Sequence, residues 1–212
     1  MSKQILVDYI PFEVSRKMIN ESIKENNGRL VVSGVLQRAD AKNQNGRVYP
    51  KDTLVREAKK YAKVQIKERR ALGELDHPDS SVVNLNNVSH NILEMHWKDN
   101  DLEGTVEVLG TPAGNILKEL FKSGIKLGIS SRGLGSVKEM NEDENGDPTV
   151  AVQPDFELIA FDFVSNPSTH GAFLSPTNEG KLNESVKVGT RDGVCCHDCK
   201  IEDLINDIFR GE

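Results

Sequence analysis

The sequence predicts a mixed α+β fold in which several antiparallel strands and two helices occupy residues 29–174. Two observations carry this prediction. Several segments are rich in β-branched residues and alternate between apolar and polar side chains, as half-buried strands do. Two others place apolar side chains at helical spacing. The chain has 212 residues, which suffices for one medium domain with tails or for two small domains, and its 37% hydrophobic content supports a packed core.

The first half of the chain predicts a short helical segment, a strand and a longer helix, in that order. Residues 15–29 are polar and end in the turn signal Asn27-Gly28, whereas residues 29–41 are β-branched and partly alternating. After a loop with an Asn-Gly turn, Pro50 opens a helix over residues 51–70. Residues 71–81 then lead through an extended segment into a proline-bounded loop. The apolar positions at helical spacing in the 51–70 segment are Leu54, Ala58, Tyr61, Ala62 and Ile66.

The second half predicts a hairpin, a helix and two further strands. Residues 88–110 alternate on both sides of the polar tip "KDND", and residues 111–124 form a short helix with Gly124 at its end. Residues 125–140 are strand-like but interrupted by glycines, and residues 150–168 are strand-like and end in a proline turn. From about residue 175 the chain becomes a polar linker, followed by an amphipathic helix that resembles a docking peptide. The apolar face of that helix, over residues 200–210, carries Ile201, Leu204, Ile205 and Ile208.

Composition excludes several classes of protein. The chain has 27 basic and 33 acidic residues, a net charge of −6, which argues against general nucleic-acid binding. It has no run of about 18 apolar residues and no signal-peptide pattern, so we expect a soluble intracellular protein that does not bind membranes. Its three cysteines lie within residues 195–199 beside His197. Zinc sites normally use two separated ligand pairs, so we expect reduced cysteines and neither a metal nor an organic cofactor.

The segment "GISSRGLG" at residues 128–135 supplies two candidate nucleophiles, Ser130 and Ser131. Its glycines allow a substrate backbone to approach closely, and Arg132 adds positive charge where an oxyanion would develop. A strand with a glycine bulge explains the same pattern. The chain has no G-x-S-x-G motif, so an α/β-hydrolase is not indicated.

A base and an acid are available elsewhere in the sequence. His77 in "GELDHPD" is the best candidate base, although a surface histidine in a loop also fits. Asp162 lies in an apolar strand, where a buried charge needs a partner; a histidine would serve, and so would an arginine. Asp155 and Glu157 are alternatives, but in a regular strand they fall on the opposite face.

Three separated motifs resemble a known family. "LGELDHP", "GISSRGLGS" and "DFVSNPSTHGAF" occur in the order found in the prohead (procapsid) maturation proteases of T4-like tailed phages, and the upstream "NQNGRVYPKDTLVREAKKY" is similar to the segment before that family's histidine. The resemblance covers about residues 29–176. It implies a serine endopeptidase with a mostly antiparallel, β-barrel-like core, flanking helices and a fold related to the herpesvirus assemblins.

The resemblance also implies roles for individual residues. His77 corresponds to the base, Ser130 to the nucleophile, being the first serine of "SSRG", and Asp162 to the acid. The assemblins use a second histidine as the third member of their catalytic triad. His170 is therefore an alternative to Asp162 in this role. The oxyanion region falls on the backbone amides of Ser131, Arg132 and Gly133.

The family's preference for cutting after glutamate, with an aliphatic residue two positions earlier, implies self-cleavage. The matching sites "INES" and "LNES" place the cuts at Glu21–Ser22 and Glu184–Ser185. We therefore expect a propeptide-like segment at residues 1–21, a protease domain at residues 22–176, and a linker with a docking tail at residues 177–212.

The expected substrates are phage scaffold, core and capsid precursor proteins, inside the procapsid in the bacterial host cytoplasm. The sequence leaves the oligomeric state open, a homo-oligomer included. A capsid-associated scaffold or structural protein without catalysis is the main alternative. A metal hydrolase that uses His77, His90 and His96 is a weaker one, because these histidines lack H-E-x-x-H spacing.

Overall fold

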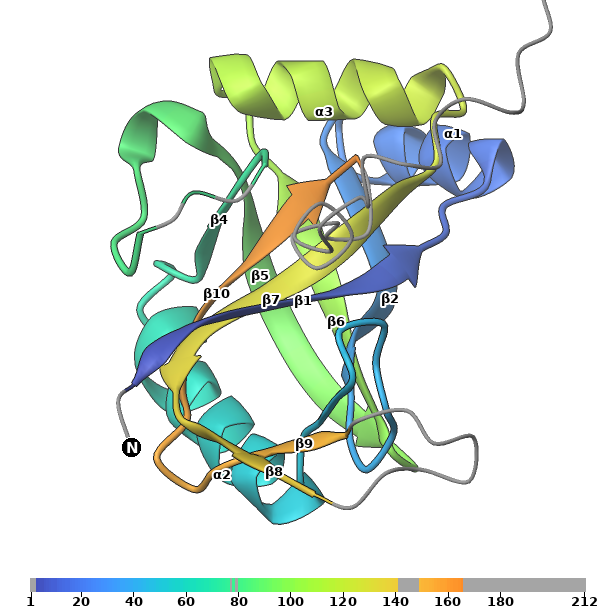
Figure 1. Ribbon diagram of the computed structural model, residues 1–212. Coiled ribbons are helices and arrows are strands. Elements are labelled where there is room, and N and C mark those ends of the chain that lie inside the picture. Colours follow the sequence, from blue (N-terminus) through green and yellow to red (C-terminus); the bar gives the residue numbers. More distant parts are fainter. Residues whose placement is uncertain (1–2, 77, 79, 141–148, 166–212) are drawn as a thin grey trace, which may run out of the picture. The chain divides into compact units, whose positions relative to one another are not determined.

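The computed structural model describes residues 3–76, 78, 80–140 and 149–165 (Figure 1). All of them belong to the first of two compact units, Met1–Ala172, and the second unit, Phe173–Glu212, lies outside the described residues. The expected linker, the 200–210 helix, His170 and the cysteines therefore lie outside the described residues as well.

The first sheet joins the beginning of the described chain to its end. It contains β1 (Gln4–Phe12), β7 (Leu127–Gly135) and β10 (Glu157–Val164), in the order β1-β7-β10, and both pairings are antiparallel. Figure 1 shows them side by side in blue, yellow and orange. The glycine-rich segment singled out in the sequence is thus the central strand of a sheet.

The second sheet has the order β2-β6-β5-β4 and contains the predicted hairpin. Its strands are β2 (Leu30–Arg38), β4 (Leu72–Glu74), β5 (Val88–Lys98) and β6 (Asp101–Val108), all antiparallel to their neighbours. The tight turn between β5 and β6 has Asp99 at φ 51°, in the left-handed region that such hairpin turns require.

A third, small sheet joins β3 (Arg47–Val48), β9 (Val150–Val152) and β8 (Val137–Glu139) in the order β3-β9-β8. The α+β class with antiparallel sheets is confirmed, but the barrel-like core is not found, because the described strands form three separate sheets. Between the first two sheets, one isolated bridge joins Leu75 to Phe163. A single bridge is too short to close the two sheets into a barrel.

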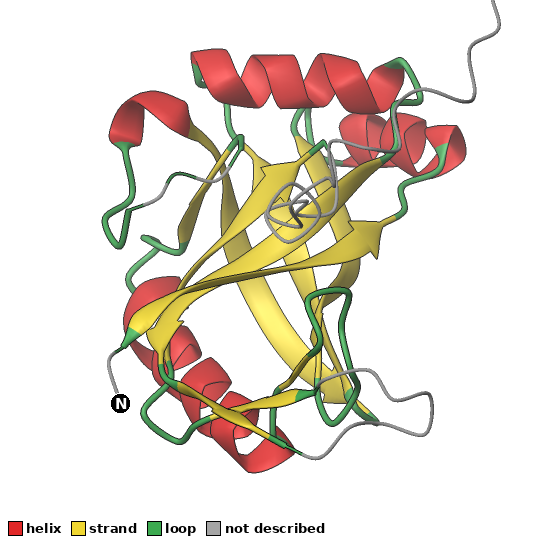
Figure 2. Cartoon of the chain, viewed as in Figure 1, coloured by secondary structure: helices red, strands yellow, loops and turns green. Residues whose placement is uncertain are grey.

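Within the described residues, three α-helices lie around the sheets (Figure 2). In α1 (Arg16–Glu25) the Ser15 hydroxyl accepts the Met18 N–H, and in α3 (Pro112–Lys122) the Thr111 hydroxyl accepts the Gly114 N–H. These are ordinary N-caps. The helix α2 (Lys51–Tyr61) ends earlier than predicted, since the chain widens into a π-helical turn at Ala62–Ile66; a short 3₁₀ turn, Leu85–Asn87, precedes β5. No described helix combines the length and apolarity needed to cross a bilayer.

The hydrophobic core lies between the first and second sheets. Side chains alternate along a strand, so each strand of the first sheet sends one set of residues inward and the other outward. The inward set includes Phe12, Ile129, Phe161 and Phe163, which pack in one cluster with Leu36, Ile92 and Val106 of the second sheet. Ser130, Arg132 and Asp162 occupy the alternate positions, on the outer face.

The N-terminal segment, expected as a propeptide-like piece, packs into the fold as a strand of the first sheet. In β1, Leu6, Asp8 and Phe12 are buried, and every residue from Gln4 to Phe12 has a partner in β7. The expected cut at Glu21–Ser22 falls inside α1, where the Ser22 hydroxyl donates to the Val31 carbonyl and accepts the Val31 N–H. Cleavage there requires α1 to unfold and would separate β1 from the rest of the chain.

Candidate active site

Ser130 lies at the centre of the first sheet, with Tyr9 of β1 and Asp162 of β10 as its Cα partners. Directly opposed residues of an antiparallel pair face the same side, so these three side chains share the outer face. The Ser130 side chain is fully buried, and among the described residues its hydroxyl has no hydrogen-bond partner. An unpaired buried hydroxyl is costly, and such groups often mark function.

Ser131 points to the opposite face and is already engaged. Its hydroxyl accepts a hydrogen bond from Gln37 Nε2 at 2.6 Å, and its Oγ lies 3.5 Å from the carbonyl oxygen of Asp8. The two serines that the sequence could not separate therefore differ in environment. Ser131 helps to join β7 to β2, whereas Ser130 has no described structural contact of this kind.

Arg132 forms the charged centre of the outer face and is fully buried. Its Nε donates to Asp162 Oδ2 at 2.8 Å, and its Nη2 donates to Asp162 Oδ1 at 3.2 Å and to Glu74 Oε1 at 2.9 Å. Its Nη1 donates to the carbonyl of Ser80 at 2.6 Å. One cation thus meets two buried carboxylates, and the cluster of Arg132, Asp162 and Glu74 has a formal charge of −1 when both acids are ionised.

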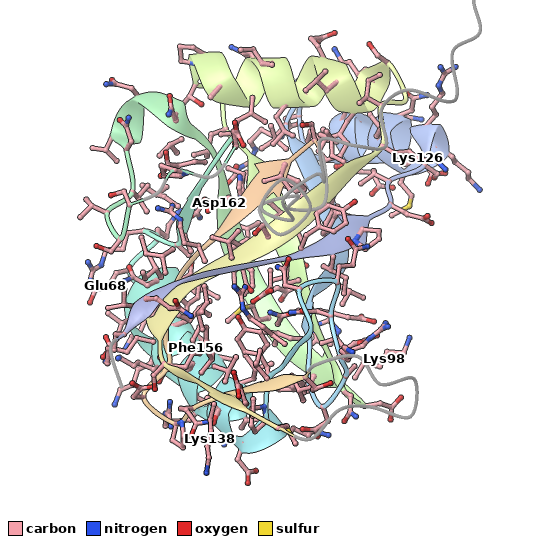
Figure 3. All side chains as sticks on the ribbon, viewed as in Figure 1. Glu68, Lys98, Lys126, Lys138, Phe156 and Asp162 are labelled. Carbon is pink, nitrogen blue, oxygen red and sulfur yellow. The ribbon has the colours of Figure 1, made fainter. Side chains whose placement is uncertain are left out.

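Asp162 is paired with an arginine, which is the alternative that the sequence left open for a buried acid. Its Oδ1 also accepts the backbone N–H of Glu74 at 3.0 Å. Burial raises the pKa of Asp162 above its usual value, and the bonds from Arg132 oppose this shift. Figure 3 labels Asp162 on β10, next to β7.

The segment that carries His77 is attached to this cluster on both sides. Before it, Leu75 bridges to Phe163, and the Asp76 N–H donates to the Phe163 carbonyl at 2.8 Å. Asp76 has φ 66°, a left-handed conformation that occurs in few non-glycine residues. After it, the Ser80 carbonyl accepts from Arg132. His77 itself lies outside the described residues.

The other candidate acids have different partners. Glu157 accepts from Lys3 Nζ at 2.9 Å near the surface, and Asp155 accepts from the backbone N–H and the hydroxyl of Ser136. Neither contact involves the Ser130 face. Among the acids that the sequence proposed as third member, Asp162 is therefore the one that the described structure brings next to Ser130.

The proposed oxyanion region, Ser131, Arg132 and Gly133, has Cα partners in both β1 and β10. In a central antiparallel strand the backbone N–H groups point alternately to the two neighbours. The pairing is irregular only toward β10, where the register shifts between Leu158 and Ala160, opposite Gly133 and Arg132. Such bulges often lie next to active sites, and this one loosens the ladder at the predicted oxyanion region.

His90 belongs to the core and not to a metal site. Its Nε2 donates to the Phe161 carbonyl at 2.9 Å and its Nδ1 accepts from the Ser89 hydroxyl at 2.8 Å, while burial lowers its pKa to about 3. His96 is exposed, and its Nε2 lies 3.2 Å from Glu103. Among the described residues, no three His, Cys, Asp or Glu side chains converge as metal ligands.

Comparison with known proteins defines the class: this chain is a peptidase of phage capsid assembly. The family described as prohead core protein serine protease matches residues 4–184, and the chain belongs to this family. It is 34% identical over 150 residues to the prohead core protein protease of Enterobacteria phage T4, a match that covers 69% of this chain and 68% of the relative. It also resembles the solved capsid assembly protease of bacteriophage T4, with a TM-score of 0.65 and 26% identity over 78% of this chain and 99% of that one.

Proposed function

We propose that the chain is a serine endopeptidase that cleaves scaffold, core and capsid precursor proteins, and itself, after glutamate in aliphatic-x-Glu sequences. The observation that carries the proposal is the buried Ser130 hydroxyl, which has no described partner and shares a sheet face with Asp162 and Arg132. The Ser130 hydroxyl has no described hydrogen bond to break before it reacts, whereas the Ser131 hydroxyl is bonded to Gln37.

In the proposed reaction Ser130 Oγ attacks the scissile carbonyl carbon while His77 accepts the serine proton. His77 then gives that proton to the leaving amine, and water hydrolyses the acyl-enzyme in a second step. The segment around His77 supports this role, because Asp76 and Ser80 hold its two sides against β10 and Arg132. Since the Ser130 side chain is fully buried, a substrate reaches it only after the structure around it opens.

Asp162 is the proposed third member. Its Oδ2 accepts one described bond, from Arg132, so it retains a lone pair for the imidazole N–H of His77. A net charge of −1 on the cluster of Arg132, Asp162 and Glu74 would further stabilise the imidazolium that forms during the reaction. Ser131, Arg132 and Gly133 stay the proposed oxyanion region, supported by the bulge opposite them.

Self-cleavage is proposed first at Glu184–Ser185. The Glu21–Ser22 bond lies in α1 and would be cut only when that helix opens, because a protease needs an extended substrate. Removal of the chain after residue 184 leaves every described strand in place.

The test compares the wild-type chain with Ser130→Ala and Ser131→Ala on a peptide containing Leu-Asn-Glu-Ser, with products identified by mass spectrometry. We expect cleavage after glutamate by the wild type and by Ser131→Ala, and none by Ser130→Ala. Equal cleavage by Ser130→Ala would remove Ser130 as the nucleophile. The same assay is repeated with empty or substrate-filled proheads present. If none of the three proteins cleaves the peptide there, the result would favour the alternative of a scaffold protein without catalysis.

A further inference from the structure

A groove of about 770 Å³ lies at the end of the first sheet where β1 leaves it and β7 enters it. Its walls come from the turn that leads into α1 and from the connection between α3 and β7. A volume in this range is typical of sites that bind a small molecule or a few side chains of a peptide. The lining that matters here consists of Tyr9, Pro11, Arg16, Met18, Ile125 and Lys126.

The groove continues the outer face that carries Ser130. Tyr9 is the Cα partner of Ser130, and Pro11 is that of Gly128, two residues before Ser130 in β7. The Tyr9 ring lies directly over Gly128, because a Cβ placed there would be 1.5 Å from the ring atom Cε2. Tyr9 thus forms the end of the groove nearest to Ser130. Lys126 is four positions before Ser130 along the chain, which at about 3.3 Å for each step is about 13 Å.

The lining combines exposed apolar side chains with cations. Met18 is 41% exposed and Ile125 is 48% exposed, although both are large apolar residues. Within the part of the chain that the structure describes, no carboxylate forms an ion pair with Arg16 or Lys126, and Glu13 is the one acid in the lining. Two cations and one acid give the groove a net charge of +1 on a chain of net charge −6.

Arg16 is held where it can face a ligand. Its guanidinium lies beside Gly124, since a Cβ placed at that glycine would be 3.4 Å from Arg16 Nη2. Gly124 has φ +76°, so it also provides the left-handed turn that ends the α3 segment and starts the approach to Lys126. Arg16 and Lys126 therefore both lie at the connection between α3 and β7, near Ile125. Figure 3 labels Lys126 at this end of β7.

We infer that this groove binds the substrate chain four or five residues from the scissile bond and selects an acidic residue beside an aliphatic one. The aliphatic side chain would pack on Met18 and Ile125, and the carboxylate would pair with Arg16 and Lys126. An extended peptide advances about 3.3 Å per residue, so a chain bound at Ser130 reaches Lys126 after about four residues. This preference of the groove is separate from the preference for glutamate at the cut. It rests on the proposed peptidase function.

The test measures peptide binding to the full Ser130→Ala chain, so that catalysis is not the readout. Fluorescent twelve-residue peptides carry Leu-Asn-Glu-Ser at the centre and alanines elsewhere. Two of them place Ile-Asp at the fourth and fifth residues from the cut, one before it and one after it, and each has an Ile-Asn counterpart. We expect one Ile-Asp peptide to bind about tenfold more tightly than its counterpart, a difference of about 1.4 kcal/mol.

Arg16→Gln with Lys126→Gln should abolish that preference without weakening the binding of the Ile-Asn peptides. Lys138→Gln, which removes an exposed cation of β8 outside the groove, should keep it. The inference is overturned if neither Ile-Asp peptide is preferred, if none binds at millimolar concentration, or if the preference survives the double variant. Failure of the proposed function is seen separately, as an absence of cleavage of the Ile-Asn peptides by the wild-type chain.

Discussion

Replacing Arg132 by methionine should strongly destabilise the fold. The substitution keeps a long apolar side chain but leaves the carboxylates of Asp162 and Glu74 buried without their cation. Both ion pairs have fully buried side chains, at 2.8 and 2.9 Å. Removing one partner from a buried pair typically costs about 3–5 kcal/mol, because the remaining charge stays uncompensated. For a domain of this size that corresponds to a fall in Tm of roughly 6–20 °C.

The assay is thermal unfolding followed by circular dichroism, with every variant made in the Ser130→Ala chain to prevent self-cleavage. Arg38→Met is the matched control. Arg38 also pairs with an aspartate, Asp101, through two hydrogen bonds, but their side chains are 53% and 26% exposed. An exposed pair contributes less than about 1 kcal/mol, so the control should lower Tm by less than about 4 °C.

A second substitution separates charge from packing. Adding Asp162→Asn to Arg132→Met removes one of the two uncompensated charges, so part of the lost Tm should return. If Arg132→Met melts within about 2 °C of its parent, or if Asp162→Asn lowers the Tm of Arg132→Met further, the reasoning about the buried cluster is wrong.

Three further predictions follow from single groups. Ser130→Ala should leave Tm unchanged or raise it, because the hydroxyl it removes is buried without a described partner; a fall of several degrees would show that the hydroxyl is bonded. The pKa of His90 falls from 6.5 to about 3 on folding, so the folded state binds fewer protons and stability should be lost as pH falls through this window, by up to about 5 kcal/mol. Urea unfolding at pH 7 and pH 4 should show this loss in the Ser130→Ala chain and in its His96→Gln control, but much less in His90→Gln; equal losses would contradict it. Mass spectrometry of the wild-type chain over time should show the cut at Glu184–Ser185 before any cut at Glu21–Ser22, and the reverse order would mean that α1 opens readily.

Local signals made several elements predictable. The β5–β6 hairpin follows from alternation on both sides of a polar turn, and α3 follows from Thr111 and Pro112 at its start and the glycine at its end. The end of α2 was predicted less well. The apolar spacing continues to Ile66, but the structure accommodates it in a π-helical turn, which sequence periodicity does not distinguish from an α-helix.

The strand β1 could not be predicted from such signals. Its buried positions include Asp8, and Pro11 argues against a strand in the interior of a sheet. The structure resolves both points. Asp8 forms an ion pair with Arg47, and Pro11 is tolerated because, among the described strands, β1 is an edge strand that pairs with β7 alone.

The candidate site was predictable in its residues but not in its contacts. Motif resemblance selected Ser130 and Asp162, and strand alternation separated Asp162 from Asp155 and Glu157. Sequence alone could not say which face is the outer one. It also could not find the partners of Arg132, because Asp162 is 30 residues away and Glu74 is 58 residues away. Those contacts depend on the pairing of distant strands.

The order of strands in the first sheet has a consequence for the timing of synthesis. The strand that carries Ser130 is flanked by the first strand of the described chain and by the last, β1 and β10. A ribosome must therefore release the chain beyond Val164 before Ser130 acquires both neighbours. A nascent or truncated chain that stops before β10 lacks Asp162 and leaves Arg132 with Glu74 as its one carboxylate partner among the described residues. With Asp162 in its proposed role, the peptidase would thus be unable to act on its own growing chain, or on capsid proteins made beside it, until translation has passed Val164.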